Sequence, residues 1–74
     1  MSAKKGTNRL HIAEYRRRAG LTQQEVGRRL GVSCQAVSKW EQGRSCPDIM
    51  LLPDIARLFG VTIDALFDFP MDER

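Results

Sequence analysis

Apolar residues recur at intervals of three and four along most of this 74-residue chain, and glycines and polar capping residues interrupt them. Such spacing places the apolar side chains on one side of a helix. The interruptions divide the chain into five short segments, without an internal repeat, a low-complexity tract or the alternation typical of strands. The pattern therefore predicts an all-α fold of five helices.

The first predicted helix runs from about Asn8 to Arg18. Ile12, Tyr15 and Ala19 follow the helical spacing and define its apolar side, while its other side is basic. Gly20 follows directly, and glycine is the preferred residue for ending a helix. We therefore expect an amphipathic helix with its apolar side in the core.

The second predicted helix begins with a capping box. Thr22 and Glu25 have the T-x-x-E spacing in which each side chain accepts a hydrogen bond from the other residue's backbone N–H. Val26 and Leu30, four residues apart, give this helix an apolar stripe. Gly31 is placed to end it.

The third predicted helix starts only three residues later. Ser33 is a suitable N-cap for a helix over residues 34–42, and Gly43 is placed to stop it. Val37 and Trp40 form its apolar stripe. This periodicity assigns Trp40 to the core rather than to stacking on a nucleic-acid base.

Two more helices are predicted in the C-terminal half. One runs from about Leu51 to Phe59 and ends at Gly60. Pro53 is compatible with it, because a first-turn N–H has no intrahelical partner. Thr62 then caps a short last helix that extends to about Phe67.

Length and composition predict a single small domain. The chain has 42% hydrophobic and 28% charged residues, ordinary values for a globular protein. We expect a basic N-terminal arm in residues 1–7, a folded domain in residues 8–68 and a C-terminal tail in residues 69–74. No apolar stretch is long enough to cross a bilayer, and the start lacks the apolar segment of a secretory signal. We therefore expect a cytoplasmic protein without membrane association.

The charge is divided unevenly along the chain. Residues 1–44 contain ten lysines or arginines and three acids, whereas residues 45–74 contain two and six. The first part carries +7 and the second −4. A basic region of this kind favours contact with a polyanion such as nucleic acid, although a solvated basic helix face explains it equally well.

The residue types needed for other chemistry are scarce. Cys34 and Cys46 are too few for a disulfide framework and lack CxxC spacing, and His11 is the one histidine. A helix of about nine residues between the two thiols rises roughly 13 Å, which is too far for a disulfide. No glycine-rich phosphate cradle or activated nucleophile is present. We therefore expect no metal, no cofactor and no enzymatic activity.

Two short helices joined through LGVS form a helix-turn-helix. Gly27 in mid-helix costs about 1 kcal/mol relative to alanine, and we interpret it as the point where the third helix crosses closely. Apolar residues lock the two helices together: Val26, Leu30, Val32, Val37 and Trp40. The opposite face of the third helix is the one expected to meet DNA, and it carries Cys34, Gln35, Ser38, Lys39 and Gln42.

The stretch GLTQQEVGRRLGVSCQAVSKWEQGRSCPDI resembles the Cro and lambda-repressor type of helix-turn-helix, the XRE family. The resemblance continues through LLPDIARLFGVTIDALF and covers residues 12–67. It implies a five-helix, lambda-repressor-like domain in which the third helix enters the major groove and the second lies across the DNA backbone. It also implies a transcriptional regulator, with repression as the expected mode.

The family pattern implies roles for individual residues. Gln23 matches a position that holds a phosphate through its side chain and backbone N–H, and Gln35 matches a base-reading position suited to adenine. Ser38 and Lys39 belong to the recognition face, where Lys39 is suited to guanine or to a phosphate. Arg44 matches a clamp on the DNA backbone, although a solvated loop arginine is the alternative.

The resemblance assigns other residues to structural or secondary roles. Arg16 and Glu41 match a pair that forms an internal salt bridge in relatives. Lys4 and Lys5 resemble the arm that some relatives wrap around DNA, although short basic tails are more often uninvolved. The chain departs from the pattern at Cys34, where many relatives carry a polar or basic residue. We interpret this thiol as a small contact residue, with redox sensing as the alternative.

One recognition helix reads only a few base pairs, so we expect a homodimer on an inverted-repeat operator in double-stranded DNA. Phe67, Phe69 and Met71 supply the expected dimer surface, while a core role for Phe67 beside a frayed tail is the alternative. A second class of function remains open. A domain of this fold can serve mainly as a protein-interaction module, for example as an antitoxin that binds a partner protein.

Overall fold

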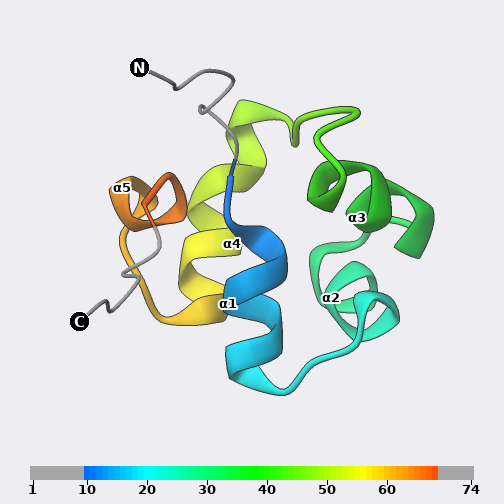
Figure 1. Cartoon of the computed structure of the whole chain (residues 1–74), viewed down its shortest axis with the longest axis horizontal. Coiled ribbons are helices and arrows are strands. Elements are labelled where there is room, and N and C mark those ends of the chain that lie inside the picture. Colours follow the sequence, from blue (N-terminus) through cyan, green and yellow to red (C-terminus); the bar gives the residue numbers. More distant parts are fainter. Residues whose placement is uncertain (1–9, 69–74) are drawn as a thin grey trace.

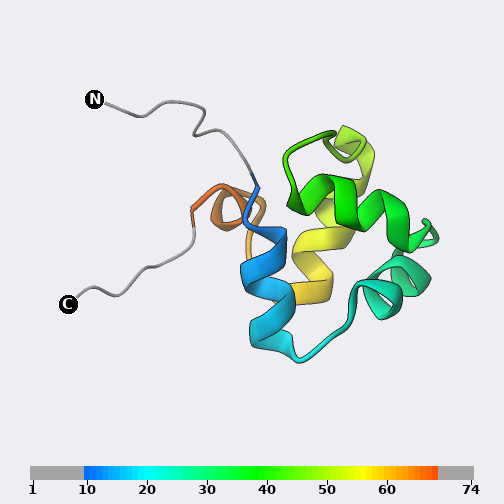
Figure 2. The same cartoon turned by 45° about the vertical axis from the view of Figure 1, so that its right-hand side comes forward.

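A computed structural model describes residues 10–68 as an all-helical domain, in agreement with the predicted fold class. Its elements, in chain order, are α1 (Ile12–Ala19), α2 (Gln23–Leu30), α3 (Cys34–Glu41), the 3₁₀ turn η2 (Ile49–Leu51), α4 (Leu52–Phe59) and α5 (Ile63–Leu66). Helices α1 and α4 occupy the middle, α2 and α3 lie on one side of them, and α5 lies on the other (Figures 1 and 2).

The predicted capping residues define where three helices begin. At α2, the Thr22 hydroxyl accepts from the Glu25 N–H at 3.0 Å, and the Glu25 carboxylate accepts from the Thr22 N–H at 2.8 Å. The Ser33 hydroxyl accepts from the Ala36 N–H at 3.1 Å at the start of α3, and Thr62 plays the same part at α5. In all three helices the cap accepts from the N–H three residues later, and this hydrogen bond fixes the helix start.

The first helix begins later than the sequence pattern predicts. Helical conformation starts at Ile12 rather than at about Asn8, and Leu10 and His11 precede it in non-helical conformation. The His11 N–H donates to the Leu66 carbonyl at 2.8 Å, and the Leu10 side chain is buried. The backbone here pairs with α5 instead of making a first helical turn, and a single-segment pattern does not reveal such long-range pairing.

The fourth helix is preceded by a turn that the sequence pattern did not separate from it. The Asp48 carboxylate accepts from the Met50 N–H at 3.1 Å and starts η2, which leads directly into α4. Pro53 lies in the first turn of α4, as predicted, where its missing N–H costs little. Gly60 ends the helix in the left-handed conformation, with a φ of 71°.

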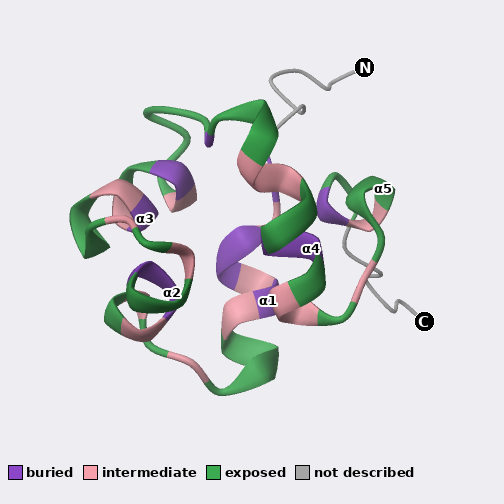
Figure 3. Ribbon diagram, turned by 180° about the vertical axis from the view of Figure 1, so that it is seen from behind, coloured by how far each residue is buried: buried purple, intermediate pink, exposed green. Residues whose placement is uncertain are grey.

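The core lies where α1, α4 and α5 meet the inner sides of α2 and α3 (Figure 3). Its fully buried side chains come from all five helices and are Ile12, Val26, Val37, Ile55 and Leu66. Ala19, predicted on the apolar side of the first helix, is instead exposed, because it lies at the last residue of α1, where the chain turns away toward α2. None of the helices within residues 10–68 combines the length and apolar character needed to cross a membrane.

Candidate nucleic-acid interface

Helix α3 presents one face to the core and the other to solvent. Val37 is fully buried and Trp40 is 7% exposed, so the inner face anchors the helix. On the outer face Cys34, Gln35 and Lys39 are exposed. The core role predicted for Trp40 is therefore confirmed, and a polar helix surface is available to a ligand.

The turn between α2 and α3 depends on a glycine. A Cβ placed on Gly27 would lie 2.7 Å from the Val32 carbonyl oxygen and 3.3 Å from the Cys34 backbone nitrogen. The first distance is far shorter than an ordinary carbon–oxygen contact, so any side chain there forces the turn outward. The close approach predicted from Gly27 is confirmed, and it involves the turn and the first residue of α3.

A partly buried polar network joins α3 to α1 and to the start of α2. Arg16 donates from Nε to Glu41 Oε2 at 2.6 Å and from Nη2 to Oε1 at 3.2 Å, while Nη1 donates to the Leu21 carbonyl at 2.9 Å. The Arg16 and Glu41 side chains are only 15% and 7% exposed. Gln23 Nε2 donates to Glu41 Oε1 at 2.9 Å. The predicted structural pair is confirmed, and three helices share it.

This network also places Gln23 at the N-terminus of α2. One hydrogen of its side-chain amide points to Glu41, which leaves the second as a donor. The first backbone N–H groups of any helix lack intrahelical partners and carry the positive end of the helix dipole. Together these donors have the chemistry of a phosphate site.

The outer face of α3 carries its own chain of side-chain hydrogen bonds. Gln42 Nε2 donates to Ser38 Oγ at 2.9 Å, and Arg44 Nη1 donates to Gln42 Oε1 at 3.4 Å. Near the start of the helix, the Cys34 thiol lies 3.9 Å from Gln35 Oε1. The structure thus brings Ser38 and Arg44 together through Gln42, which was predicted on this face but is not among the predicted contact residues. Its four-residue separation from Ser38 was the signal for the pairing.

Residues of the expected dimer surface are only partly described. Phe67 is 47% exposed, so it is not the core residue of the alternative interpretation. Phe69 and Met71 lie outside the described residues. Two apolar side chains outside the predicted dimer surface, Ile49 and Met50, are 73% and 77% exposed in η2.

The two cysteines are free thiols, and both are exposed. Within residues 10–68, no three histidine, cysteine or acidic side chains gather so that they would hold a metal ion. The capping box lowers the pKa of Glu25 below its ordinary value of 4.5, chiefly because the Thr22 backbone N–H donates to the carboxylate. The hydrogen bond that lowers this pKa also stabilises the start of α2.

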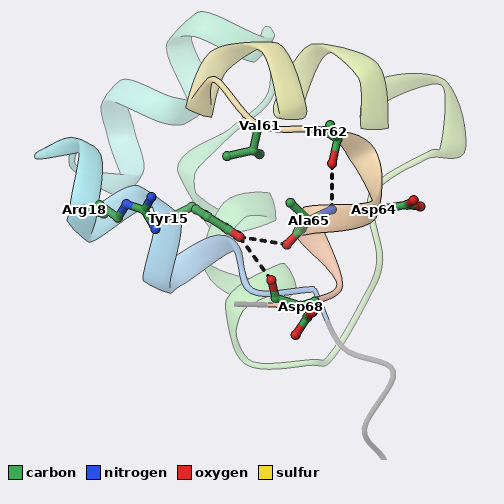
Figure 4. A pocket seen from close by; sticks show the side chains of 7 residues that line it. All are labelled: Tyr15, Arg18, Val61, Thr62, Asp64, Ala65 and Asp68. Carbon is green, nitrogen blue, oxygen red and sulfur yellow. Dashed lines mark hydrogen bonds between the residues drawn. The ribbon is translucent and has the colours of Figure 1, made fainter. Parts of the chain in front are cut away.

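A shallow groove of about 490 Å³ lies between α1 and α5 (Figure 4), and α3 lies on the opposite side of the domain from α5 (Figure 1). Its lining combines one arginine, two acids and a tyrosine with smaller residues, and comprises Tyr15, Arg18, Val61, Thr62, Asp64, Ala65 and Asp68. The Arg18 guanidinium lies 5.5 Å from the centre of the Tyr15 ring. The mixed charge of this groove contrasts with the polar and basic outer face of α3.

Comparison with known proteins identifies the class of this domain. Residues 12–66 match the Helix-turn-helix family, and the match covers more than half of the chain. The chain therefore belongs to this family, in its Cro and phage-repressor (XRE) type. Family and fold together define a helix-turn-helix domain of the kind found in DNA-binding transcriptional regulators.

Individual relatives agree with this class. The chain is 35% identical over 65 residues to an HTH-type transcriptional regulator of Archaeoglobus fulgidus, covering 88% of this chain and 93% of that protein. It is 39% identical over 59 residues to another from Methanocaldococcus jannaschii, covering 80% and 89%. The transcriptional activator BcrR of Enterococcus faecalis is 40% identical over 55 residues, which span 74% of this chain but only 27% of BcrR.

The fold also matches a solved structure. The DNA-binding domain of the P22 c2 repressor, determined by nuclear magnetic resonance, superimposes with a TM-score of 0.79 over 95% of both chains, at 22% sequence identity. At this identity the match establishes the arrangement of the helices. The roles of single residues must be argued from their own geometry.

Proposed function

We propose that this protein binds double-stranded DNA sequence-specifically as a transcriptional regulator, with α3 in the major groove. One observation carries the proposal. The exposed polar face of α3 belongs to a helix whose inner face is buried and whose orientation is fixed through Glu41, in a domain of the helix-turn-helix family. A helix held rigidly on one side and polar on the other is suited to reading base edges.

Base reading is assigned to residues near the start and middle of α3. Gln35 is exposed, and its amide is suited to donate to adenine N7 and accept from adenine N6. Lys39, one turn further on, reaches either guanine or a phosphate. Cys34 lies beside Gln35 and acts as a small contact residue.

Phosphate binding is assigned to both ends of the helix pair. At one end, Gln23 offers its remaining amide hydrogen together with the backbone N–H groups that begin α2. At the other, the exposed Arg44 follows α3 and clamps the backbone. Phosphate contacts on both sides of the groove fix the register in which α3 lies along the DNA bases.

The protein acts as a homodimer on an inverted-repeat operator and represses by occupying its site. Phe67, exposed at the end of α5, supports a dimer surface that includes Phe69 and Met71. A twofold dimer places its recognition helices about 34 Å apart, so the half-site centres lie roughly 10 base pairs apart. Replacing Phe69 with aspartate should reduce cooperative binding to the full site without unfolding the protein.

Selection of binding sites from random duplex DNA tests this function, followed by footprinting on the selected sequence. We expect one inverted repeat with the spacing given above. Its affinity should fall about 10³-fold or more between 50 and 200 mM salt if the dimer makes about six phosphate contacts. Recovery of no common sequence, or an affinity that does not change with salt, would contradict the proposal.

A further inference from the structure

We infer that Gln42 is a positioning residue that determines which base edge Ser38 reads, and this inference rests on the proposed function. It starts from the chain of hydrogen bonds along the outer face of α3. Arg44 donates to the Gln42 carbonyl oxygen at 3.4 Å, and the Gln42 amide nitrogen donates to the Ser38 hydroxyl oxygen at 2.9 Å.

The two bonds fix the direction of the Gln42 amide. Arginine has only donors, so the side of the amide that meets Arg44 must be its oxygen. The NH₂ group then faces Ser38. The reverse orientation would place NH₂ against a guanidinium and leave two donors in contact.

The direction of the amide in turn fixes the role of Ser38. A serine hydroxyl has one hydrogen and two lone pairs, and here a lone pair accepts from Gln42. Within residues 10–68, no acceptor takes the hydroxyl hydrogen. Ser38 therefore meets the groove as a donor. Its partners there are acceptors, namely purine N7, guanine O6 or thymine O4, whereas cytosine presents only its N4 amino group.

Arg44 connects this base contact to the DNA backbone. Its guanidinium carries five N–H donors, and the bond to Gln42 uses one of them. The others remain for a phosphate. Ser38 lies one helical turn from Gln42, so the phosphate contact and the base contact share one intermediate, and the position of the backbone helps to orient the hydroxyl.

The Gln42→Glu variant tests the inference most sharply. A carboxylate still accepts from Arg44, but it cannot donate to Ser38 and instead takes the hydroxyl hydrogen. Ser38 then faces the groove with lone pairs, so its preference should move toward an amino group. The Gln24→Glu variant is the matched control, because it changes the same residue type by the same charge at an exposed position of α2.

The experiment is site selection from random duplex DNA, performed with the full chain and each variant. The Ser38→Ala variant first identifies the operator position that Ser38 reads, as the position whose preference relaxes. There we expect the parent to disfavour cytosine by about 3- to 10-fold, the range for one neutral hydrogen bond. Gln42→Glu should remove or reverse this bias against cytosine, and Gln42→Ala should weaken it. Gln24→Glu should lower the affinity for all sequences but leave the bias against cytosine unchanged.

Three outcomes would overturn the inference. In the first, Ser38→Ala relaxes the base preference at no operator position. In the second, Gln42→Glu and Gln42→Ala both keep the parental base preference at the position that Ser38 reads. In the third, Gln24→Glu changes that base preference as much as Gln42→Glu does. Thermal melting shows whether each variant is folded. If Gln42→Glu melts early, Gln42→Ala replaces it as the test variant. If the parent protein itself selects no sequence, the proposed function fails. If the parent selects an operator and one of the three outcomes above is found, only the inference about Gln42 fails.

Discussion

The two sides of α1 are attached to the rest of the domain by different chemistry. On the side toward α3, Arg16 and Glu41 form a two-bond ion pair between side chains that are 15% and 7% exposed. On the side toward α5, the Tyr15 hydroxyl donates to the Ala65 carbonyl at 2.9 Å and to the Asp68 carbonyl at 3.2 Å (Figure 4). The first attachment joins two side chains in a fixed geometry, and the second joins one neutral group to backbone.

The difference shows where the domain requires rigidity. A paired guanidinium and carboxylate restrict both distance and angle, so α3 is held in one orientation relative to α1 and α2. Helix α5 is held by the fully buried Leu66 side chain together with neutral hydrogen bonds to its backbone. Apolar packing has little directionality. The helix that we propose reads DNA thus has the more directional support.

The largest effect is expected for Glu41→Ala. Removing this carboxylate leaves Arg16 and Gln23 without their shared partner in a nearly buried site, and loss of one member of a buried pair costs roughly 3–5 kcal/mol. Urea unfolding measures the loss. The control is Asp54→Ala, which breaks the Asp54–Arg57 pair, whose side chains are 54% and 75% exposed, and should change stability by less than about 1 kcal/mol. Similar losses in the two variants would remove the distinction between the attachments.

Gly27→Ala should have the next largest effect. Alanine is the better helix former, but its methyl group would press on the Val32 carbonyl oxygen 2.7 Å away. Overpacking against backbone costs roughly 1–3 kcal/mol, so we expect net destabilisation by denaturant unfolding. Arg28→Ala, at the exposed neighbouring position, should be nearly neutral. A Gly27→Ala protein more stable than the parent would show that the turn yields easily.

Tyr15→Phe should cost less. The ring and its stacking on Phe59, with centroids 6.1 Å apart, remain, while the two carbonyls lose their donor. A neutral hydrogen bond contributes about 1 kcal/mol, and the loss should appear as an earlier unfolding midpoint. Because this bond lies on the α5 side, DNA affinity per folded molecule should stay at the parental level. A loss of affinity without a loss of stability would contradict the separation of the two sides.

The smallest effect concerns the capping box of α2 and depends on pH. The pKa of Glu25 lies below 4.5 in the folded protein because the ionised carboxylate accepts from the Thr22 N–H. Its stabilising contribution is therefore complete above pH 4.5 and is lost as the pH falls through the folded pKa. Glu25→Gln retains an acceptor but no titrating group. The stability advantage of the parent should shrink on acidification, and an advantage that stays constant from pH 7 to 3 would argue against this cap.

Local signals allowed much of the helix-turn-helix to be predicted. Thr22 and Ser33 mark helix starts by their own spacing, and Gly27 indicates a close approach without any knowledge of its partner. A predicted helix boundary was wrong where a contact with a distant residue determines it. The start of α1 depends on a bond between the His11 N–H and Leu66, which lie far apart in the chain.

Local sequence signals predict part of the candidate site as well. Helical periodicity alone assigns Gln35 and Lys39 to the face opposite Val37. The spacing of Ser38 and Gln42 permits a contact between them, but the rotamers that connect these two residues and Arg44 are properties of the folded surface. Likewise, a sequence pattern does not show that Gln23 shares Glu41 with Arg16, because that contact needs three helices in place.

Competition binding of the Gln35→Ala variant tests most directly whether the outer face of α3 reads DNA. Affinities for the selected operator and for a scrambled duplex are measured at one salt concentration for the parent, Gln35→Ala and Gln23→Ala. We predict that Gln35→Ala loses roughly 1–3 kcal/mol on the operator and almost nothing on the scrambled duplex. Gln23→Ala should weaken both alike, as expected for a phosphate contact. Equal losses of Gln35→Ala on the two duplexes, or no loss on either, would contradict the account.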